Sequence, residues 1–147
     1  MELFSVEAID LDVKACDKQS VLDYMVGVLE RAGKLNDAKL YRQEIENREK
    51  LSTTGIGFGI AIPHAKTAAV KEAHVAVGIS KDGVDYGSED GGKVHLIFMI
   101  AATADDSDLH LRMLASLARK LIDPVYRQKL LDCHTKPEVL ELLKEIG

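Results

Sequence analysis

Apolar residues in the first part of the chain recur at intervals of three and four, the spacing of one face of an α-helix. The first such stretch has apolar residues at Val21, Leu22, Met25, Val28 and Leu29. Asp17 is a candidate N-cap for it, and Gly33 suits its end. A second stretch, DAKLYRQEIENREKL, follows the candidate N-cap Asn36 and has fewer apolar residues among many charges. The pattern predicts two helices, of which the second is the more exposed.

The pattern then changes to three short and mostly apolar runs, FGIAIP, HVAVGI and VHLIFMIA. The runs are rich in residues that favour β-structure, and Gly, Pro and charged segments bound them. The first and third are apolar at consecutive positions, as expected for strands that helices cover on both faces. These runs therefore predict the strands of a central sheet.

Helical periodicity returns after the segment TADDSD, in a stripe made of Leu109, Met113, Leu114, Leu117, Ala118, Leu121 and Ile122. Pro124, directly after Asp123, suits the first position of a shorter helix. Thr135 and Glu138 have the spacing of a capping box at the start of a last helix. The elements together predict an α/β fold with a central mixed β-sheet of about five strands flanked by helices, in a single domain over residues 1–147.

Composition narrows the class of protein further. The chain has 147 residues, of which 46% are hydrophobic and 29% charged, a size and balance that suit one compact domain. Its net charge of -5 argues against a nucleic-acid partner. No apolar run approaches the roughly 18 residues of a membrane span, and the start of the chain does not resemble a secretory signal, which predicts a soluble, cytoplasmic protein. Cys16 and Cys133 have no CxxC spacing, so we expect both to be reduced and structural.

The segment TTGIGFGIAIPHAK is the candidate for chemistry, because it ends on a proline and a histidine. Its three alternate glycines do not fit the dinucleotide-binding pattern GxGxxG, which also requires a helix where a strand follows here. They are better explained as positions where the backbone turns or approaches its neighbours closely. Pro63 restricts the direction of the chain, and we expect it to deliver His64 at the C-terminal end of the strand, where sites of open α/β sheets cluster. The alternative is that His64 is an ordinary loop residue.

Three segments carry a resemblance to a known family: REKLSTTGIGFGIAIPHAK, DGGKVHLIFMIAA and HLRMLASLARKL. From about Ile9 to the C-terminus, the chain resembles the enzyme IIA domain of the fructose–mannitol type from the bacterial sugar phosphotransferase system. In that family the histidine of G-x-A-I-P-H accepts a phosphoryl group from the phosphocarrier protein HPr and passes it to a IIB domain. The resemblance implies that His64 is the acceptor, that His110 is the second active-site histidine, and that Arg48 and Glu49 match the family's R-E pair. It implies no role for Phe58.

The residue types suit these implied roles. A neutral imidazole can accept a phosphoryl group and release it again. We place His110 about three residues into a helix capped by Asp106 or Ser107, where the helix dipole disfavours a cation, and expect a neutral N–H donor. The alternative is a surface histidine of an amphipathic helix.

The supporting residues leave more alternatives open. Arg48 offers a planar fork of donors for phosphate, unless it is only a solvated helix charge. Thr53 and Thr54 either donate their hydroxyl groups to the phosphoryl group or cap a turn. Glu49 is the more doubtful member of the R-E pair.

The remaining titratable residues predict no metal or cofactor site. His74, His95 and His134 lack a motif and a metal-ligand partner at useful spacing. The acidic residues Asp105, Asp106 and Asp108 suit the N-terminal end of a helix better than a Mg²⁺ site.

Two functions follow from the resemblance. The favoured one is a phosphotransferase of sugar uptake, more similar to fructose-type members, with HPr as donor and a IIB domain of a sugar permease as acceptor. Such a protein reaches the membrane only indirectly, through the permease complex. The alternative is a regulatory module, as in the nitrogen-related branch, whose phosphorylation state controls its binding to other proteins.

Overall fold

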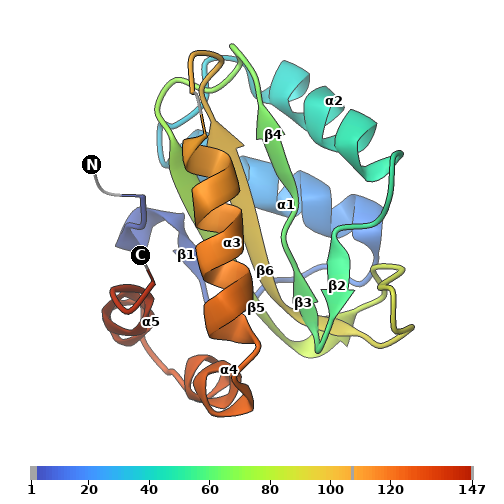
Figure 1. The fold of residues 1–147 in the computed structure, drawn as a ribbon, viewed down its shortest axis with the longest axis vertical. Coiled ribbons are helices and arrows are strands. Elements are labelled where there is room, and N and C mark those ends of the chain that lie inside the picture. Colours follow the sequence, from blue (N-terminus) through green and yellow to red (C-terminus); the bar gives the residue numbers. More distant parts are fainter. Residues whose placement is uncertain (1–2, 107, 147) are drawn as a thin grey trace.

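The computed structural model describes residues 3–106 and 108–146, in which a β-sheet lies between layers of helices (Figure 1). In chain order the elements are a 3-10 turn η1 (Val6–Ala8), β1 (Ile9–Asp10), α1 (Lys18–Arg31), α2 (Ala38–Glu49), β2 (Gly55–Gly57), β3 (Ile60–Ala61), β4 (His64–Lys66), β5 (His74–Val84), β6 (Val94–Ala102), α3 (Leu109–Leu121), α4 (Pro124–Leu131) and α5 (Lys136–Leu143).

The sheet is mixed and has the strand order β1-β5-β6-β3-β2, with β4 also paired to β6. The long central strands β5 and β6 are antiparallel, whereas β1 is parallel to β5, and β3 and β4 are parallel to β6. The α/β fold with a central mixed sheet is therefore confirmed. The sheet has six strands within the described residues, one more than the expected five, because the run after Gly59 forms the two short strands β3 and β4.

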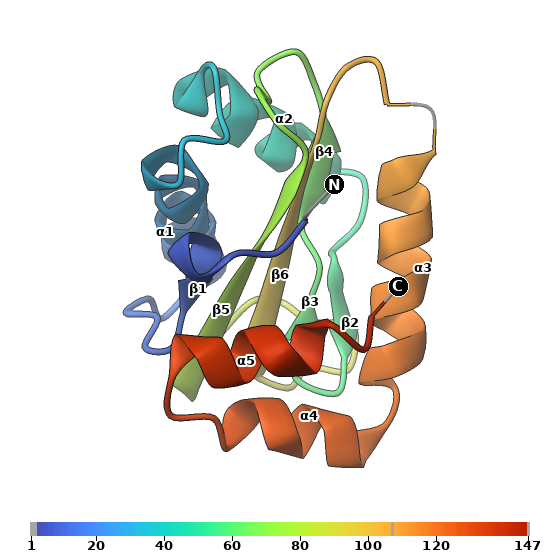
Figure 2. The ribbon, with the colours of Figure 1, turned by 90° about the vertical axis from the view of Figure 1, so that its left-hand side faces the viewer.

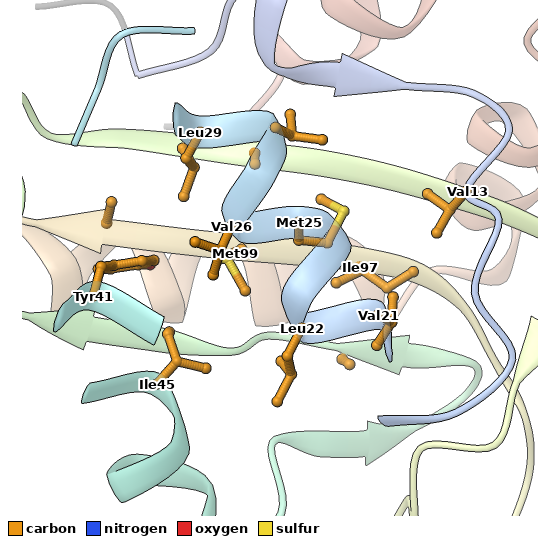
Figure 3. Close-up of a cluster of buried hydrophobic side chains, with 14 of the residues drawn as sticks. Val13, Val21, Leu22, Met25, Val26, Leu29, Tyr41, Ile45, Ile97 and Met99 are labelled. Carbon is orange, nitrogen blue, oxygen red and sulfur yellow. The ribbon is translucent and has the colours of Figure 1, made fainter. Parts of the chain in front are cut away.

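Each face of the sheet has its own hydrophobic core, and Figure 2 shows the helical layers from the side. On one face, α1 and α2 pack against the sheet, and Figure 3 shows Leu22, Met25 and Tyr41 lying over Ile97 and Met99 of β6. The other face carries the alternate residues of β6, such as Phe98, under α3, α4 and α5. Consecutive apolar residues on β6 are therefore explained, because both of its faces are buried.

Side chains cap the N-terminal ends of most helices, as the sequence indicates. Asp17 accepts a hydrogen bond from the backbone N–H of Ser20, and Thr135 and Glu138 form the expected capping box. The expectation for α2 was wrong by one residue, since its N-cap is Asp37, whose carboxylate accepts from the Leu40 N–H at 3.0 Å. Asn36 instead donates its side-chain amide to the Ala68 carbonyl.

The alternate glycines serve the turn and the close approach that we expected. Phe58 and Gly59 both have positive φ, of 59° and 77°, so they form the two central residues of a type I′ turn between β2 and β3. At Gly55, a Cβ atom would lie only 2.9 Å from the Cα of Ser88.

In residues 3–106 and 108–146, no helix has the length and apolar character to cross a membrane.

Candidate functional site

His64 lies inside an edge segment of the sheet and not at the exit from a strand. Ile60 of β3 pairs with Leu96, and His64 of β4 pairs with Ile100, so the register along β6 is the same for both strands. Pro63 has no N–H to donate, but its carbonyl accepts from the Ile100 N–H at 2.9 Å. The proline therefore interrupts the strand without redirecting it, and β3 and β4 follow one another along β6 (Figure 1). His64 begins β4, which corrects its expected placement at the C-terminal end of a strand.

The alternation of side chains along this edge directs His64 toward α3. Ile60 and Ile62 belong to the core under α3, whereas Ala61 and Ala65 pack on the opposite face with α1 and α2. Successive residues of a strand point to opposite faces, so His64 lies on the same face as Ile60 and Ile62. His110, at the start of α3, is close enough to lower the pKa of His64. The fold thus brings together two histidines that are far apart in the sequence.

The ring of His64 is fixed by a backbone contact. Its Nδ1 lies 2.8 Å from the carbonyl oxygen of Ile62. A carbonyl oxygen only accepts, so Nδ1 carries the proton and Nε2 carries the lone pair. Burial lowers the pKa of His64, the Ile62 carbonyl opposes this shift, and the positive charge of Arg48 lowers the pKa further. Burial therefore favours the neutral form of the ring, whose free lone pair is at Nε2.

Arg48 lies in the last turn of α2. Its Nη1 donates to the carbonyl oxygen of Ser52 at 2.9 Å, which ties the guanidinium to the loop that follows the helix. Its positive charge lowers the pKa of His64. Arg48 therefore acts electrostatically on this ring, and its role in binding a phosphoryl group stays a prediction.

His110 lies in the first turn of α3, but the cap differs from our expectation. The helix begins after Asp108, which occupies the N-cap position without a side-chain cap bond, and Ser107 lies outside the described residues. Asp106 nevertheless accepts from the backbone N–H groups of Leu109 at 2.8 Å and His110 at 3.0 Å. The acidic segment thus supplies the N-terminal end of a helix, and the Asp106 side chain is only 6% exposed.

The ring of His110 also contacts Asp106. Its Nδ1 lies 2.8 Å from Oδ2 of this carboxylate. Burial raises the pKa of Asp106, but hydrogen bonds from the backbone and ring of His110 outweigh this effect, and the net shift is downward. Because the ionised carboxylate only accepts, the proton of the neutral ring is on Nδ1. The N–H group of the neutral ring therefore donates to Asp106, whereas we expected a neutral N–H donor that faces the phosphoryl group.

Glu49 and Thr54 form a buried group of contacts with each other and with residues of other elements. Glu49 is buried and accepts from Lys18 Nζ at 2.7 Å and from the Thr54 hydroxyl at 2.5 Å. The Thr54 oxygen also lies 2.9 Å from the Tyr86 hydroxyl. The Thr53 oxygen accepts from the Gly55 N–H at 3.1 Å, which is the turn-capping alternative. These contacts tie the loop between α2 and β2 to α1 and to Tyr86.

Sequence reasoning missed Lys18 and Tyr86, because neither stands in a motif. They come from α1 and from the segment after β5, and they meet Glu49 only in the folded chain. The three histidines without a motif take other positions, since the rings of His74 and His95 contact Ser5 and Ser80 and His134 lies on the surface before α5.

Comparison with known proteins identifies the family of this chain. The family model described as "Phosphoenolpyruvate-dependent sugar phosphotransferase system, EIIA 2" matches residues 2–146. The fructose-specific EIIABC component of the phosphotransferase system from Bacillus subtilis is 46% identical over 98% of this chain, which spans only 23% of that relative's length.

Two solved structures share the fold. The nitrogen regulatory protein IIA-Ntr from Neisseria meningitidis superposes with a TM-score of 0.88 at 30% identity, over 96% of both chains. The Escherichia coli complex of enzyme IIA mannitol with phosphorylated enzyme IIB mannitol gives a TM-score of 0.83 at 28% identity, over 97% of both chains. The fold and the family model together define a phosphocarrier class of phosphotransferase. The chain belongs to the EIIA 2 family of the phosphoenolpyruvate-dependent sugar phosphotransferase system.

Proposed function

We propose that this protein carries a phosphoryl group in sugar uptake, accepting it on His64 from phosphorylated HPr and passing it to a sugar-specific IIB domain. The observation that carries this proposal is the bond from His64 Nδ1 to the Ile62 carbonyl. It leaves Nε2 as the only ring nitrogen with a lone pair, on the face where His110 lies and beside Arg48. A nucleophile with two neighbouring cationic or donor groups is what phosphoryl transfer requires.

The transfer step follows from this geometry. The lone pair of His64 Nε2 forms a bond to phosphorus while the bond from phosphorus to the donor's histidine nitrogen breaks. His64 needs to lose no proton, because its one ring proton remains on Nδ1, bonded to Ile62. Charge spreads over the three equatorial phosphoryl oxygens in a loose transition state. Arg48 and His110 stabilise that charge, and the same steps in reverse pass the group to the next acceptor.

The named relatives support the partners and the substrate class. The Bacillus subtilis relative is a fructose-specific component with A, B and C parts, which favours a fructose-type system. The neighbouring solved complex joins a IIA protein to a phosphorylated IIB protein, which favours a IIB domain as acceptor. The proposed transfer requires no metal or nucleotide, because the phosphoryl group arrives already activated on another histidine.

A regulatory role is the second candidate. The high structural similarity to IIA-Ntr favours it, since that protein is described as a nitrogen regulatory protein. The two functions differ in the onward step, because a carrier passes its phosphoryl group to a IIB domain and a regulator keeps it as a signal. Transfer to a purified fructose-type IIB domain within seconds supports the carrier, and a stable phosphoprotein in its presence supports the regulator. Adjacent IIB and IIC genes would also favour transport.

The test of the acceptor is single-turnover transfer from radiolabelled phospho-HPr. We expect one acid-labile and base-stable phosphoryl group per chain in the wild type, and no label in His64→Ala. His134→Ala is the matched control, since His134 is an exposed histidine that precedes α5, and it should label like the wild type. Phosphorus–nitrogen NMR coupling should place the group on Nε2. Labelling of His64→Ala at the wild-type rate would refute the assignment.

A further inference from the structure

Asp106 links the ring of His110 to the first turn of α3. Its Oδ1 accepts from the Leu109 N–H at 2.8 Å, and its Oδ2 accepts from the His110 N–H at 3.0 Å. The same Oδ2 lies 2.8 Å from His110 Nδ1. One buried carboxylate thus fixes both the backbone that carries the ring and the ring itself.

These contacts determine which ring nitrogen faces the phosphoryl group. An imidazole has its two nitrogens on opposite sides, so a ring held at Nδ1 presents Nε2 away from Asp106. The titratable groups around the ring come from three elements. They are Asp106 before α3, His64 on β4, and His74 on β5, which lines the same small pocket as His110 and Asp106. Asp106 is the acidic member of this set, and its bond is to His110 Nδ1.

We propose that Asp106 is a positioning residue for phosphoryl transfer: it holds His110 in the Nδ1–H form and directs Nε2 toward the group carried by His64. This inference rests on the proposed function. The neutral ring then offers a lone pair at Nε2, which cannot donate to a phosphoryl oxygen. His110 becomes a donor when Nε2 takes up a proton from solvent as the anionic phosphoryl group arrives. The proton returns to solvent when the group is passed on.

The first test reads the ring nitrogens of His110 directly by nitrogen-15 NMR of the unphosphorylated protein. In the wild type at alkaline pH, we expect the proton of the neutral ring on Nδ1. In Asp106→Asn, which keeps the shape but not the charge, we expect part of the population to move its proton to Nε2. Asp108→Asn makes the same chemical change two residues away, at an exposed carboxylate paired with Arg112, and should keep the wild-type form.

The second test separates an effect through the ring from an effect on the helix. Asp106→Asn should slow acceptance from phospho-HPr by roughly ten- to hundredfold, as is typical when a carboxylate partner of a functional histidine is lost. In a His110→Ala background the same change should alter the rate less than about twofold, because contributions made through one residue are not additive. Circular dichroism confirms that each variant is folded.

The results of these tests distinguish the positioning role of Asp106 from the proposed function of the protein. A wild-type Nδ1–H form and wild-type rate in Asp106→Asn would overturn the positioning role. Equal slowing by Asp106→Asn in the wild-type and His110→Ala backgrounds would assign Asp106 to the helix alone and would also overturn it. A wild-type protein that accepts no phosphoryl group refutes the proposed function instead, while the NMR result still reports on Asp106.

Discussion

His64 and His110 each have Nδ1 2.8 Å from an oxygen atom, but one oxygen is neutral and the other is charged. His64 contacts the backbone carbonyl of Ile62, within the edge of the sheet. His110 contacts the carboxylate of Asp106, at the start of a helix. Both contacts fix a tautomer and an orientation. Only the second places a negative charge next to the ring.

The difference explains how two identical side chains take different roles. A carbonyl holds His64 in place without stabilising a second proton strongly, and burial lowers its pKa, so the ring remains a nucleophile. A carboxylate next to His110 suits a ring that must become a donor to an anion. We infer that the partner of Nδ1, and not the histidine itself, decides which ring accepts the phosphoryl group and which stabilises it.

The largest effect that tests this comparison is expected for His110→Ala. Loss of one group that stabilises developing charge typically reduces a rate by about 10²–10³, or about 3–4 kcal/mol. His64 remains in place, so the stoichiometry of labelling should still reach one per chain. Single-turnover transfer from phospho-HPr, followed by transfer to the IIB domain, measures both half-reactions.

Leu111→Ala, at the exposed neighbouring position of α3, controls for changes at the helix surface and tests whether this position affects docking. A folded His110→Ala protein that matches the wild type in both half-reactions would remove His110 from the site. A His110→Ala protein that accepts no phosphate while His64→Ala does would reverse the two roles.

Much of the fold could be predicted from the sequence, because hydrophobic periodicity and helix capping depend on residues that are close together in the sequence. The apolar run of β6 and the stripe of α3 identify buried elements without knowledge of their partners. The division of the edge segment into β3 and β4 was not predictable, since it depends on pairing with β6 across Pro63. The cap of α2 was misplaced because Asn36 and Asp37 are both good capping residues, and the contact of Asn36 with Ala68 is not local.

The candidate site shows the same limit. The residue types at His64, His110 and Arg48 indicate phosphoryl chemistry, and both Arg48 and His110 lower the pKa of His64 in the folded chain. The sequence could not show which way each ring is held, because the oxygens of Ile62 and Asp106 reach the rings only in the folded chain. Glu49 had an open assignment for a similar reason, since its partner Lys18 lies on another helix.

A smaller effect is expected for Arg48→Ala, which removes the cation beside His64 and leaves the bonds of both rings intact. A hydrogen bond to a charged group typically contributes about 1.5–3 kcal/mol, so the transfer rate should fall roughly ten- to hundredfold. Arg48→Lys keeps the positive charge but lacks the planar fork of donors, so its transfer rate should lie between those of the wild type and Arg48→Ala. Lys50→Ala removes an exposed cation two residues away and should transfer at the wild-type rate. Equal slowing in Lys50→Ala would assign the effect of Arg48 to the general charge of this surface.

The smallest effect concerns stability, and it tests whether His64 is held as a neutral ring. Burial lowers the pKa of His64 in the folded protein, whereas the unfolded chain titrates near 6.5. Below about pH 6.5 the unfolded chain therefore binds a proton that the folded protein does not, and the free energy of unfolding falls as the pH drops toward the lowered folded pKa. Urea unfolding of wild type and His64→Gln at pH 8.5, 7.5 and 5 measures this contribution. The free energies of unfolding of the two proteins should change in parallel from pH 8.5 to 7.5. Between pH 7.5 and 5, that of the wild type should fall more than that of His64→Gln. A wild type that instead gains stability relative to His64→Gln on acidification would mean that the folded protein holds His64 as a cation, and the contrast between the two histidines would fail.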